Sequence, residues 1–400
     1  MAKESLSKRV KRVVEDPIKT AGKDVLFFRT LPQAYRRAIA AHPVDPNKAL
    51  FISQKMLEPP DSFSLMMPYL RDVCGMEVEY VGLGKISDGL GAYVKRCQDL
   101  MDSIATAHFV FLDDASDVVS CLPLRPETRV AQLWHACGAF KKWGMSTADL
   151  LFGGSSKQKR RHPFYANLHL ATVSSSEVAW AYREAMDLQD TPEVVRPLGV
   201  SRTDIFFDQE FLAGARELVE QAVPQARGRK ILLYAPTFRG RSVGAQAPDA
   251  LDIPLLRERL EGEWVLLIKH HPYVQAPPPI PDSCKDFAFF VADQPTDRLM
   301  AAADILVTDY SSVVFEYALL DRPMAFFAYD LEDYDDWRGF YYPYEEMTPG
   351  PIARTTEELA AYAESLGEGF DPTEVRAFRE KFMGACDGHA TERIVQAMCE

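Results

Sequence analysis

The hydrophobic residues of this chain gather in short runs that alternate with amphipathic stretches, and the alternation begins near Lys48. Runs of roughly four to eight apolar residues indicate buried strands, whereas apolar positions three and four apart indicate helices. The first half is therefore predicted to contain strands over 49–53, 77–81, 108–112, 128–133 and 168–173, and helices over 62–74, 90–105 and 177–186. This alternation is typical of a mostly parallel sheet with helices on both faces.

A second series follows a predicted helix over 209–223. Its strands are expected at 230–234, 264–268, 287–291, 305–309 and 324–328, with helices near 299–300 and over 311–320. Proline, glycine and arginine interrupt the pattern between Pro224 and Arg229, which indicates a domain boundary. We therefore predict an α/β fold with two doubly wound, Rossmann-like domains, 25–224 and 225–400, that face a central cleft. The last helix is a candidate to pack back on the first domain.

Composition narrows the class of protein. The chain has 400 residues, 47% of them hydrophobic, which is enough for two packed cores. A net charge of -13 argues against a nucleic-acid partner. Seven scattered cysteines without metal-binding spacing indicate reduced thiols in the cytoplasm. Because no apolar run is long enough to span a membrane and no signal peptide opens the chain, we expect a protein that is soluble or bound to the cytoplasmic face of a membrane.

Two basic segments favour the second of these locations. Residues 1–24 place Leu6, Val10 and Val13 at helical spacing among lysines and arginines, as in a helix that lies on an anionic membrane surface. A second basic cluster comprises Lys157, Lys159, Arg160, Arg161 and His162. Either segment could instead be a solvated run of charges.

The segment Leu133–Gly144 contains the first candidate chemistry. His135 follows the strand predicted over 128–133, and ligands bind at the carboxyl ends of strands in such sheets. An imidazole there can take a proton from a hydroxyl group, while Lys141 can hold an anion. The alternative is a core histidine beside Trp134, but the turn at Gly138 and the lysine pair favour a site.

Three strand ends of the second domain carry further candidates. Thr308, Asp309, Ser311 and Ser312 lie where a strand meets a helix, a place suited to a pyrophosphate, and Glu316 one turn later could reach a ribose hydroxyl. Ser311 could also simply cap the helix. The other two strand ends supply His271, which we favour over His270 as the ligand, and Arg239, which could neutralise a phosphate.

Arg202 is a similar candidate from the first domain, although it could instead pair locally with Asp204. We predict no metal site and no cofactor. Asp113–Asp114 and the acidic run 332–336 could hold a divalent ion, but the run fits a solvated loop or a lid facing the acceptor better. The absence of a glycine-rich nucleotide loop argues against NAD enzymes and kinases.

Several motifs occur in a fixed order: WHxxGAFK from Trp134, GxxRTD from Gly199, YAPTFR from Tyr234, KxHP from Lys269, TDYSS from Thr308 and RGFY from Arg338. From about His108 to the C-terminus, this set resembles the CDP-glycerol glycerophosphotransferases of teichoic acid synthesis. The resemblance implies a GT-B fold and attachment to the cytoplasmic membrane face. It also implies transfer of glycerol phosphate from CDP-glycerol to a lipid-linked saccharide or glycerol-phosphate acceptor.

The same resemblance suggests roles for individual residues. His135 resembles the family's proposed general base. His271, Arg239, Thr308, Ser311 and Ser312 resemble ligands of the donor phosphates, and His271 is also a catalytic candidate. Alternatives to glycerophosphotransfer are CDP-ribitol as donor, a nucleotide-sugar glycosyltransferase on the same fold, and a silent scaffold at the membrane. Assembly into a homo-oligomer stays open.

Overall fold

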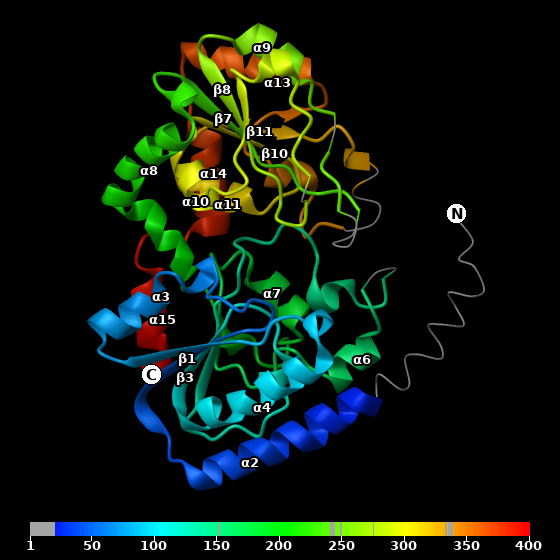
Figure 1. Cartoon of the computed structure of the whole chain (residues 1–400), viewed down its shortest axis with the longest axis vertical. Coiled ribbons are helices and arrows are strands. Elements are labelled where there is room, and N and C mark those ends of the chain that lie inside the picture. The colour runs from blue at the N-terminus through cyan, green and yellow to red at the C-terminus, as the bar shows by residue number, and fades with distance from the viewer. Residues whose placement is uncertain are drawn as a thin grey trace, which may run out of the picture.

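The computed structural model describes residues 21–150, 153–240, 245–248, 250–274, 276–332, 334 and 339–400. They form two six-stranded parallel sheets, one in each of two lobes stacked along the long axis (Figure 1). The strand order is β2-β1-β3-β4-β5-β6 in the first sheet and β12-β11-β10-β7-β8-β9 in the second. The second order is that of a Rossmann domain, and both orders reverse beside a central strand, where such folds bind ligands. The predicted fold class is confirmed.

Each predicted strand is present, and two short ones are added at the sheet edges. The first sheet comprises β1 (Asp45–Ser53), β2 (Glu77–Gly82), β3 (Ala107–Leu112), β4 (Arg129–Gln132), β5 (Leu170–Thr172) and β6 (Val195–Arg196). The second comprises β7 (Lys230–Tyr234), β8 (Trp264–Ile268), β9 (Ala288–Phe290), β10 (Ile305–Thr308), β11 (Met324–Phe327) and β12 (Ile352–Ala353). All pairings within the two sheets are parallel.

Helices cover both faces of each sheet. Those of the first lobe are α2 (Leu31–Ala41), α3 (Met66–Pro68), α4 (Leu90–Thr106), α5 (Asp117–Ser120), α6 (Ser156–Arg161) and α7 (Ala179–Met186). The next helix, α8 (Gln209–Ala222), leads to the second lobe and lies beside it (Figure 1). Those that follow are α9 (Ile253–Leu260), α10 (Thr296–Ala302), α11 (Val313–Ala318), α13 (Thr356–Ser365), α14 (Thr373–Met383) and α15 (Ala390–Cys399).

The strands are apolar at nearly every position because both of their faces are covered. In β1, Leu50 and Ile52 point to one face and pack in the cluster that contains the buried side of α4. Ala49 and Phe51 point to the other face, where they pack with Phe63. A strand of this kind shows a continuous apolar run instead of an alternating one, and the sequence pattern was recognisable for that reason.

The prediction of one continuous helix over 62–74 is wrong. The segment consists of a 3₁₀ turn, Asp61–Phe63, the single turn of α3, and a π-helical turn, Tyr69–Val73. Pro68 contributes to this break because it has no N–H to donate within a regular helix.

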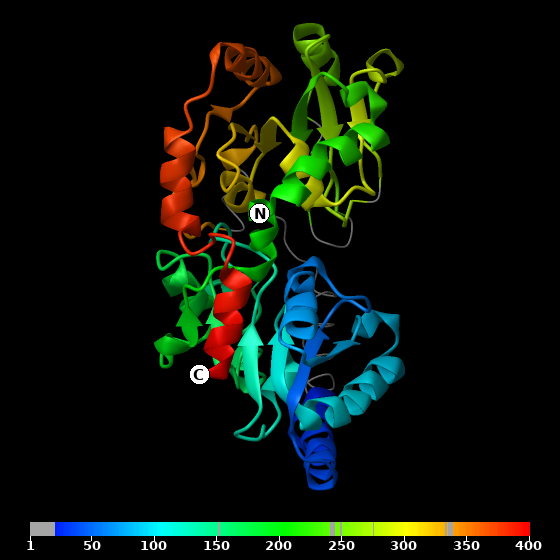
Figure 2. The same ribbon diagram turned by 90° about the vertical axis from the view of Figure 1, so that its left-hand side faces the viewer.

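The C-terminal part of the chain crosses from the second lobe back to the first. Phe378 and Phe382 of α14 pack against Phe315 of α11, with ring centroids 5.4 and 5.7 Å apart. In α15, Ile394 belongs to the same buried cluster as Phe51 of the first sheet. Figure 2 shows this last helix, in red, beside the lower lobe.

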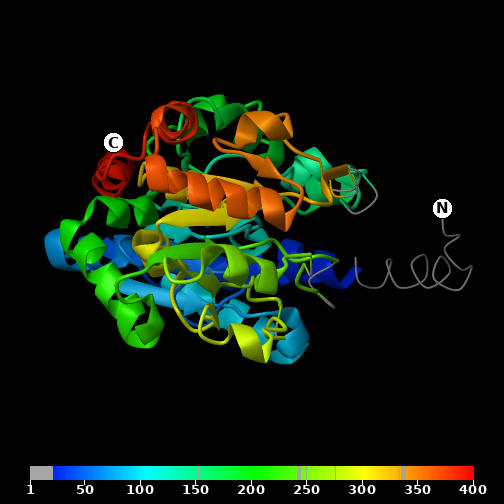
Figure 3. The same cartoon turned by 90° about the horizontal axis from the view of Figure 1, so that it is seen from above.

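A second connection joins the lobes directly. The backbone N–H of Lys142 donates to the carbonyl oxygen of Gly339 at 3.1 Å, and that of Tyr341 donates to Phe140 at 3.0 Å. Viewed along the long axis, the second lobe lies over the first (Figure 3). These contacts hold the loop after β4 against the second lobe.

Candidate functional site

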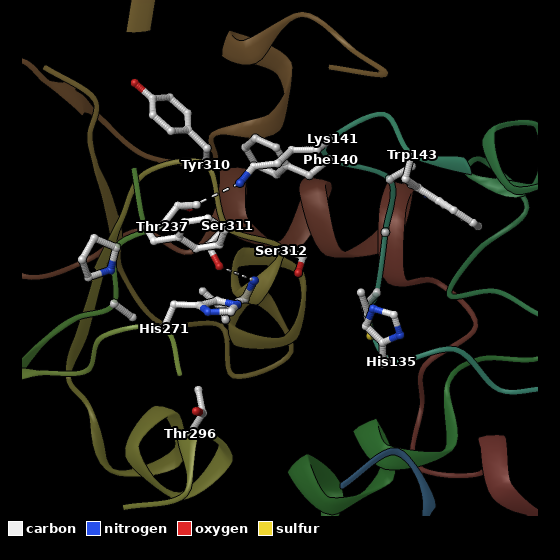
Figure 4. A pocket seen from close by; sticks show the side chains of 18 of the residues that line it. His135, Phe140, Lys141, Trp143, Thr237, His271, Thr296, Tyr310, Ser311 and Ser312 are labelled. Atoms are coloured by element: carbon white, nitrogen blue, oxygen red, sulfur yellow. Dashed lines mark hydrogen bonds between the residues drawn. The ribbon is translucent and has the colours of Figure 1, made fainter. Parts of the chain in front are cut away.

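A pocket of about 400 Å³ lies between the lobes, at the carboxyl ends of β4, β7, β8 and β10. The first lobe contributes residues 134–143 and Tyr182, and the second contributes 235–238, 269–272, Thr296 and 310–313. Figure 4 shows His135 on one side of the pocket and His271 on the other. The loops that the sequence analysis selected therefore meet in one place.

His135 presents one ring nitrogen to the pocket. Its Nδ1 lies 3.0 Å from the backbone carbonyl oxygen of Asp113. Because a carbonyl can only accept, this contact places the proton of the neutral ring on Nδ1 and leaves Nε2 as an acceptor. Burial lowers the pKa of His135, although the nearby Asp114 carboxylate opposes the shift. At neutral pH the ring is therefore uncharged and able to take a proton.

Aromatic rings form the wall beside His135. Trp134 stacks on Trp143 with ring centroids 4.2 Å apart, and Tyr165 and Tyr182 contact this pair edge-on. Their packing stabilises the loop after β4 against the first lobe.

His271 presents the opposite kind of nitrogen. Its Nδ1 accepts a hydrogen bond from the backbone N–H of Tyr273 at 3.2 Å, so the neutral ring carries its proton on Nε2. Burial lowers the pKa of His271, and the positive charge of Lys141 adds to the shift. The neighbouring His270 is buried and packs its ring on Phe290, 5.2 Å away. His271 is thus the more accessible of the two, as expected.

The second lobe also lines the pocket with hydroxyl groups. Ser311 and Ser312 lie at the start of α11, and Thr237 lies after β7. The ammonium group of Lys141 reaches across from the first lobe and donates to the Thr237 hydroxyl at 3.5 Å. Together these groups make a polar surface suited to phosphate oxygens.

Arg239, Thr308 and Asp309 lie behind this surface and do not line the pocket. Arg239 binds both oxygens of Asp330, at 2.6 and 3.0 Å, and one oxygen of Asp309 at 2.9 Å. Asp309 in turn accepts from the backbone N–H of Thr237 at 2.8 Å. Burial alone would lower the pKa of Arg239, but the two carboxylates outweigh it and raise the pKa. In this structure these residues hold the loop that carries Thr237.

Arg202 and Glu316 form an ion pair with each other. Arg202 belongs to a 3₁₀ helix of the first lobe, Ser201–Phe207, whereas Glu316 belongs to α11. Glu316 is only 3% exposed, and burial raises its pKa while Arg202 opposes the shift. The alternative pairing of Arg202 with Asp204 does not occur, because Asp204 accepts from the backbone N–H groups of Ala390 and Thr391.

Comparison with known proteins shows the family of this chain. The family model described as CDP-Glycerol:Poly(glycerophosphate) glycerophosphotransferase matches residues 34–400. The chain belongs to this family. It is a polyol-phosphate transferase of teichoic acid biosynthesis.

Two curated relatives illustrate the range of the family. The teichoic acid ribitol-phosphate primase of Bacillus spizizenii is 35% identical over 90% of this chain and 93% of its own length. The teichoic acid glycerol-phosphate primase of Bacillus subtilis is 28% identical over 72% of both chains. The chain spans about half the length of the ribitol-phosphate polymerases that it also matches.

Solved structures agree on the fold. The wall teichoic acid polymerase TagF aligns with a TM-score of 0.74 and 21% identity, over 99% of this chain and 98% of that one. A UDP-GlcNAc 2-epimerase from Neisseria meningitidis aligns with a TM-score of 0.53 and 11% identity, over 88% of this chain and 99% of that one. The chain therefore has the predicted GT-B-like architecture.

Some residues that line the pocket were not predicted from the sequence. Thr296, at the start of α10, and Thr237 line the pocket, but single threonines at strand and helix ends carry no distinctive pattern. The contact that orients His135 was missed as well, since it is made by the backbone of Asp113 and not by a side chain.

Within the described ranges, no group of three or more histidine, cysteine, aspartate or glutamate side chains could hold a metal ion. Asp113 and Asp114 contact Ser53 and Lys55 instead. Asp333, Asp335 and Asp336 of the acidic run lie outside the described residues, as do Arg338 and residues 1–20. None of the described helices has the length and apolar character needed to cross a bilayer.

Proposed function

We propose that this protein transfers a polyol phosphate from a CDP-activated polyol to a hydroxyl group of a lipid-linked acceptor in teichoic acid synthesis, releasing CMP. The observation that carries the proposal is the composition of the pocket. An acceptor nitrogen, Nε2 of His135, faces it from the first lobe, and a set of donors, Ser311, Ser312 and His271, faces it from the second. One side is suited to deprotonate a nucleophile and the other to bind the donor phosphates.

In the proposed reaction the acceptor hydroxyl gives its proton to Nε2 of His135. The oxygen then forms a bond to the β-phosphorus of the donor. The bond between that phosphorus and the bridging oxygen breaks, and CMP leaves with the electron pair. Nε2–H of His271, the ammonium of Lys141 and the two serine hydroxyls stabilise the charge on the phosphates. Binding both substrates between the lobes supplies further rate by orientation.

The identity of the donor polyol is a separate part of the proposal. The ribitol-phosphate primase is more similar to this chain than the glycerol-phosphate primase, which favours CDP-ribitol. The family description and the motif resemblance favour CDP-glycerol, the donor predicted from the sequence. The residues that line the pocket suit the phosphates of either donor, so CDP-ribitol is the first donor to test and CDP-glycerol the second.

We also propose that the protein works on the cytoplasmic face of the membrane, bound to anionic lipid. The basic cluster predicted to help is partly neutralised, since Arg160 pairs with Asp187 and Arg161 with Asp24. The proposal therefore depends mainly on the basic segment 1–24, most of which lies outside the described residues. Deleting residues 1–23 is expected to reduce binding to anionic liposomes, and unchanged binding would contradict the idea.

The deciding experiment measures CMP release by purified protein with CDP-ribitol, CDP-glycerol or a UDP-sugar, with and without a lipid-linked acceptor. We expect acceptor-dependent CMP release from a CDP-polyol, with the preferred donor giving the higher kcat/KM. If the protein consumes only a UDP-sugar, the proposal is wrong and the protein is a glycosyltransferase. Membrane binding with no turnover of any donor would favour the silent scaffold.

A further inference from the structure

Gln132, the last residue of β4, is fully buried and bridges two loops. Its Oε1 accepts a hydrogen bond from the backbone N–H of Trp134 at 3.0 Å. Its Nε2 donates to the backbone carbonyl oxygen of Asp114 at 2.9 Å. One amide group therefore connects the loop that carries His135 with the loop that follows β3.

Both hydrogen bonds adjoin the contact that orients His135. Asp113, whose carbonyl accepts from the His135 ring, is directly bonded to Asp114. On the other side, Trp134 precedes His135 and has a φ of 60°, a left-handed conformation that residues with a side chain rarely adopt. Gln132 therefore fixes the backbone on both sides of the His135–Asp113 hydrogen bond.

We propose that Gln132 is the positioning residue of His135, holding the ring with its proton on Nδ1 and its Nε2 facing the pocket. The inference rests on the proposed function of His135 as a base. An amide is the side chain suited to this task, because it offers an acceptor to one backbone group and a donor to the other. Glutamate of the same shape keeps only the acceptor, and methionine keeps neither.

The test compares Gln132→Glu and Gln132→Met with the wild type by two independent readouts. The first is the split between kcat and KM in CMP release. We expect kcat to fall by about 10²-fold, since a misplacement of about 1 Å costs that much, with a much smaller change in KM for the donor. The second is the nitrogen chemical shifts of His135 in histidine-labelled protein, assigned with His135→Asn. These should change from a single Nδ1–H tautomer to a mixture.

Asn167→Gly is the control, because Asn167 has a φ of 67° and glycine adopts that conformation without strain. The Asn167 amide also joins backbone groups of the first lobe, since its Nδ2 donates to the carbonyl oxygens of Val119 and Leu122 at 3.0 and 2.9 Å. It does not contact His135, so its loss should leave kcat and the tautomer of His135 unchanged. A folded Gln132→Met protein with wild-type kcat and an unchanged tautomer would overturn the inference. A wild type that turns over no CDP-polyol would overturn the proposed function, and the nitrogen shifts would then decide the positioning role alone.

Discussion

At the scale of single residues, the two pocket histidines differ in the nitrogen that they present. The backbone of Asp113 fixes the proton of His135 on Nδ1, whereas the backbone of Tyr273 fixes that of His271 on Nε2. Burial lowers the pKa of each, so both rings are neutral near pH 7. Neutral rings with opposite tautomers can act as base and as donor in the same pocket.

Replacing His135 by alanine removes the proposed base. We expect kcat for CMP release to fall by about 10²–10⁴-fold, the usual contribution of general-base catalysis. Because the side chain faces the pocket and makes one hydrogen bond to a backbone carbonyl, the melting temperature should change little. Turnover and thermal melting of the two proteins check this, and near-normal turnover by a folded variant would make His135 structural.

The pH dependence follows from the lowered pKa of His135. Above that pKa the ring is neutral and can accept a proton, whereas below it the imidazolium cannot. We therefore expect kcat/KM to fall as the pH is lowered, with an apparent pKa under the ordinary 6.5.

Asp113 needs a separate control, because burial raises the pKa of its carboxyl to about 6. Asp113→Asn keeps the backbone carbonyl that contacts His135 and should keep the acid limb of the profile. Loss of that limb in Asp113→Asn would assign it to the carboxyl group instead.

At the scale of elements, the loop after β4 must approach α11 closely. Gly138 has a φ of 61°, and a Cβ atom there would lie 2.2 Å from the Phe315 ring. Its N–H also donates a hydrogen bond to the hydroxyl oxygen of Ser174 at 3.1 Å. Glycine is therefore the residue that lets the two lobes meet beside the pocket.

Gly138→Ala is expected to destabilise the protein by about 2–5 kcal/mol, combining left-handed strain with overpacking against a buried ring. Gly214→Ala is the control, because Gly214 lies inside α8 with no atom within 4 Å of its added Cβ. That variant should stabilise the protein by about 0.5–1 kcal/mol. Denaturant unfolding measures both, and equal effects of the same sign would refute the argument.

The architecture could be predicted from the sequence because buried strands show continuous apolar runs, as in Ile305–Thr308. The sequence analysis missed β6 and β12, which have two residues each and no pattern to recognise. It placed His135, His271, Ser311 and Ser312 at strand ends and Lys141 a few residues after His135, and the structure brings all five into the pocket. It could not tell that Arg239 and Asp309 lie behind the wall, because long-range ion pairs leave no local signal.

At the scale of the whole molecule, the ion pair of Arg202 and Glu316 joins the lobes beside the pocket. The sequence analysis predicted Arg202 and Glu316 as donor ligands, whereas in this structure the two side chains pair with each other. The two hypotheses differ in what they require of Glu316. A ribose ligand affects binding of the donor, and a buried ion pair affects the association of the lobes and thus stability.

A double-mutant cycle with Arg202→Met and Glu316→Gln separates these hypotheses. Breaking one side of a buried pair costs about 3–5 kcal/mol, so Arg202→Met alone should be strongly destabilising because it leaves Glu316 buried and unpaired. Neutralising Glu316 in the same protein should recover much of the lost stability. We expect unfolding free energies to show this coupling while KM for the donor stays near the wild-type value in Glu316→Gln. If Glu316→Gln instead raises KM without loss of stability, Glu316 binds the donor and the lobes separate during turnover.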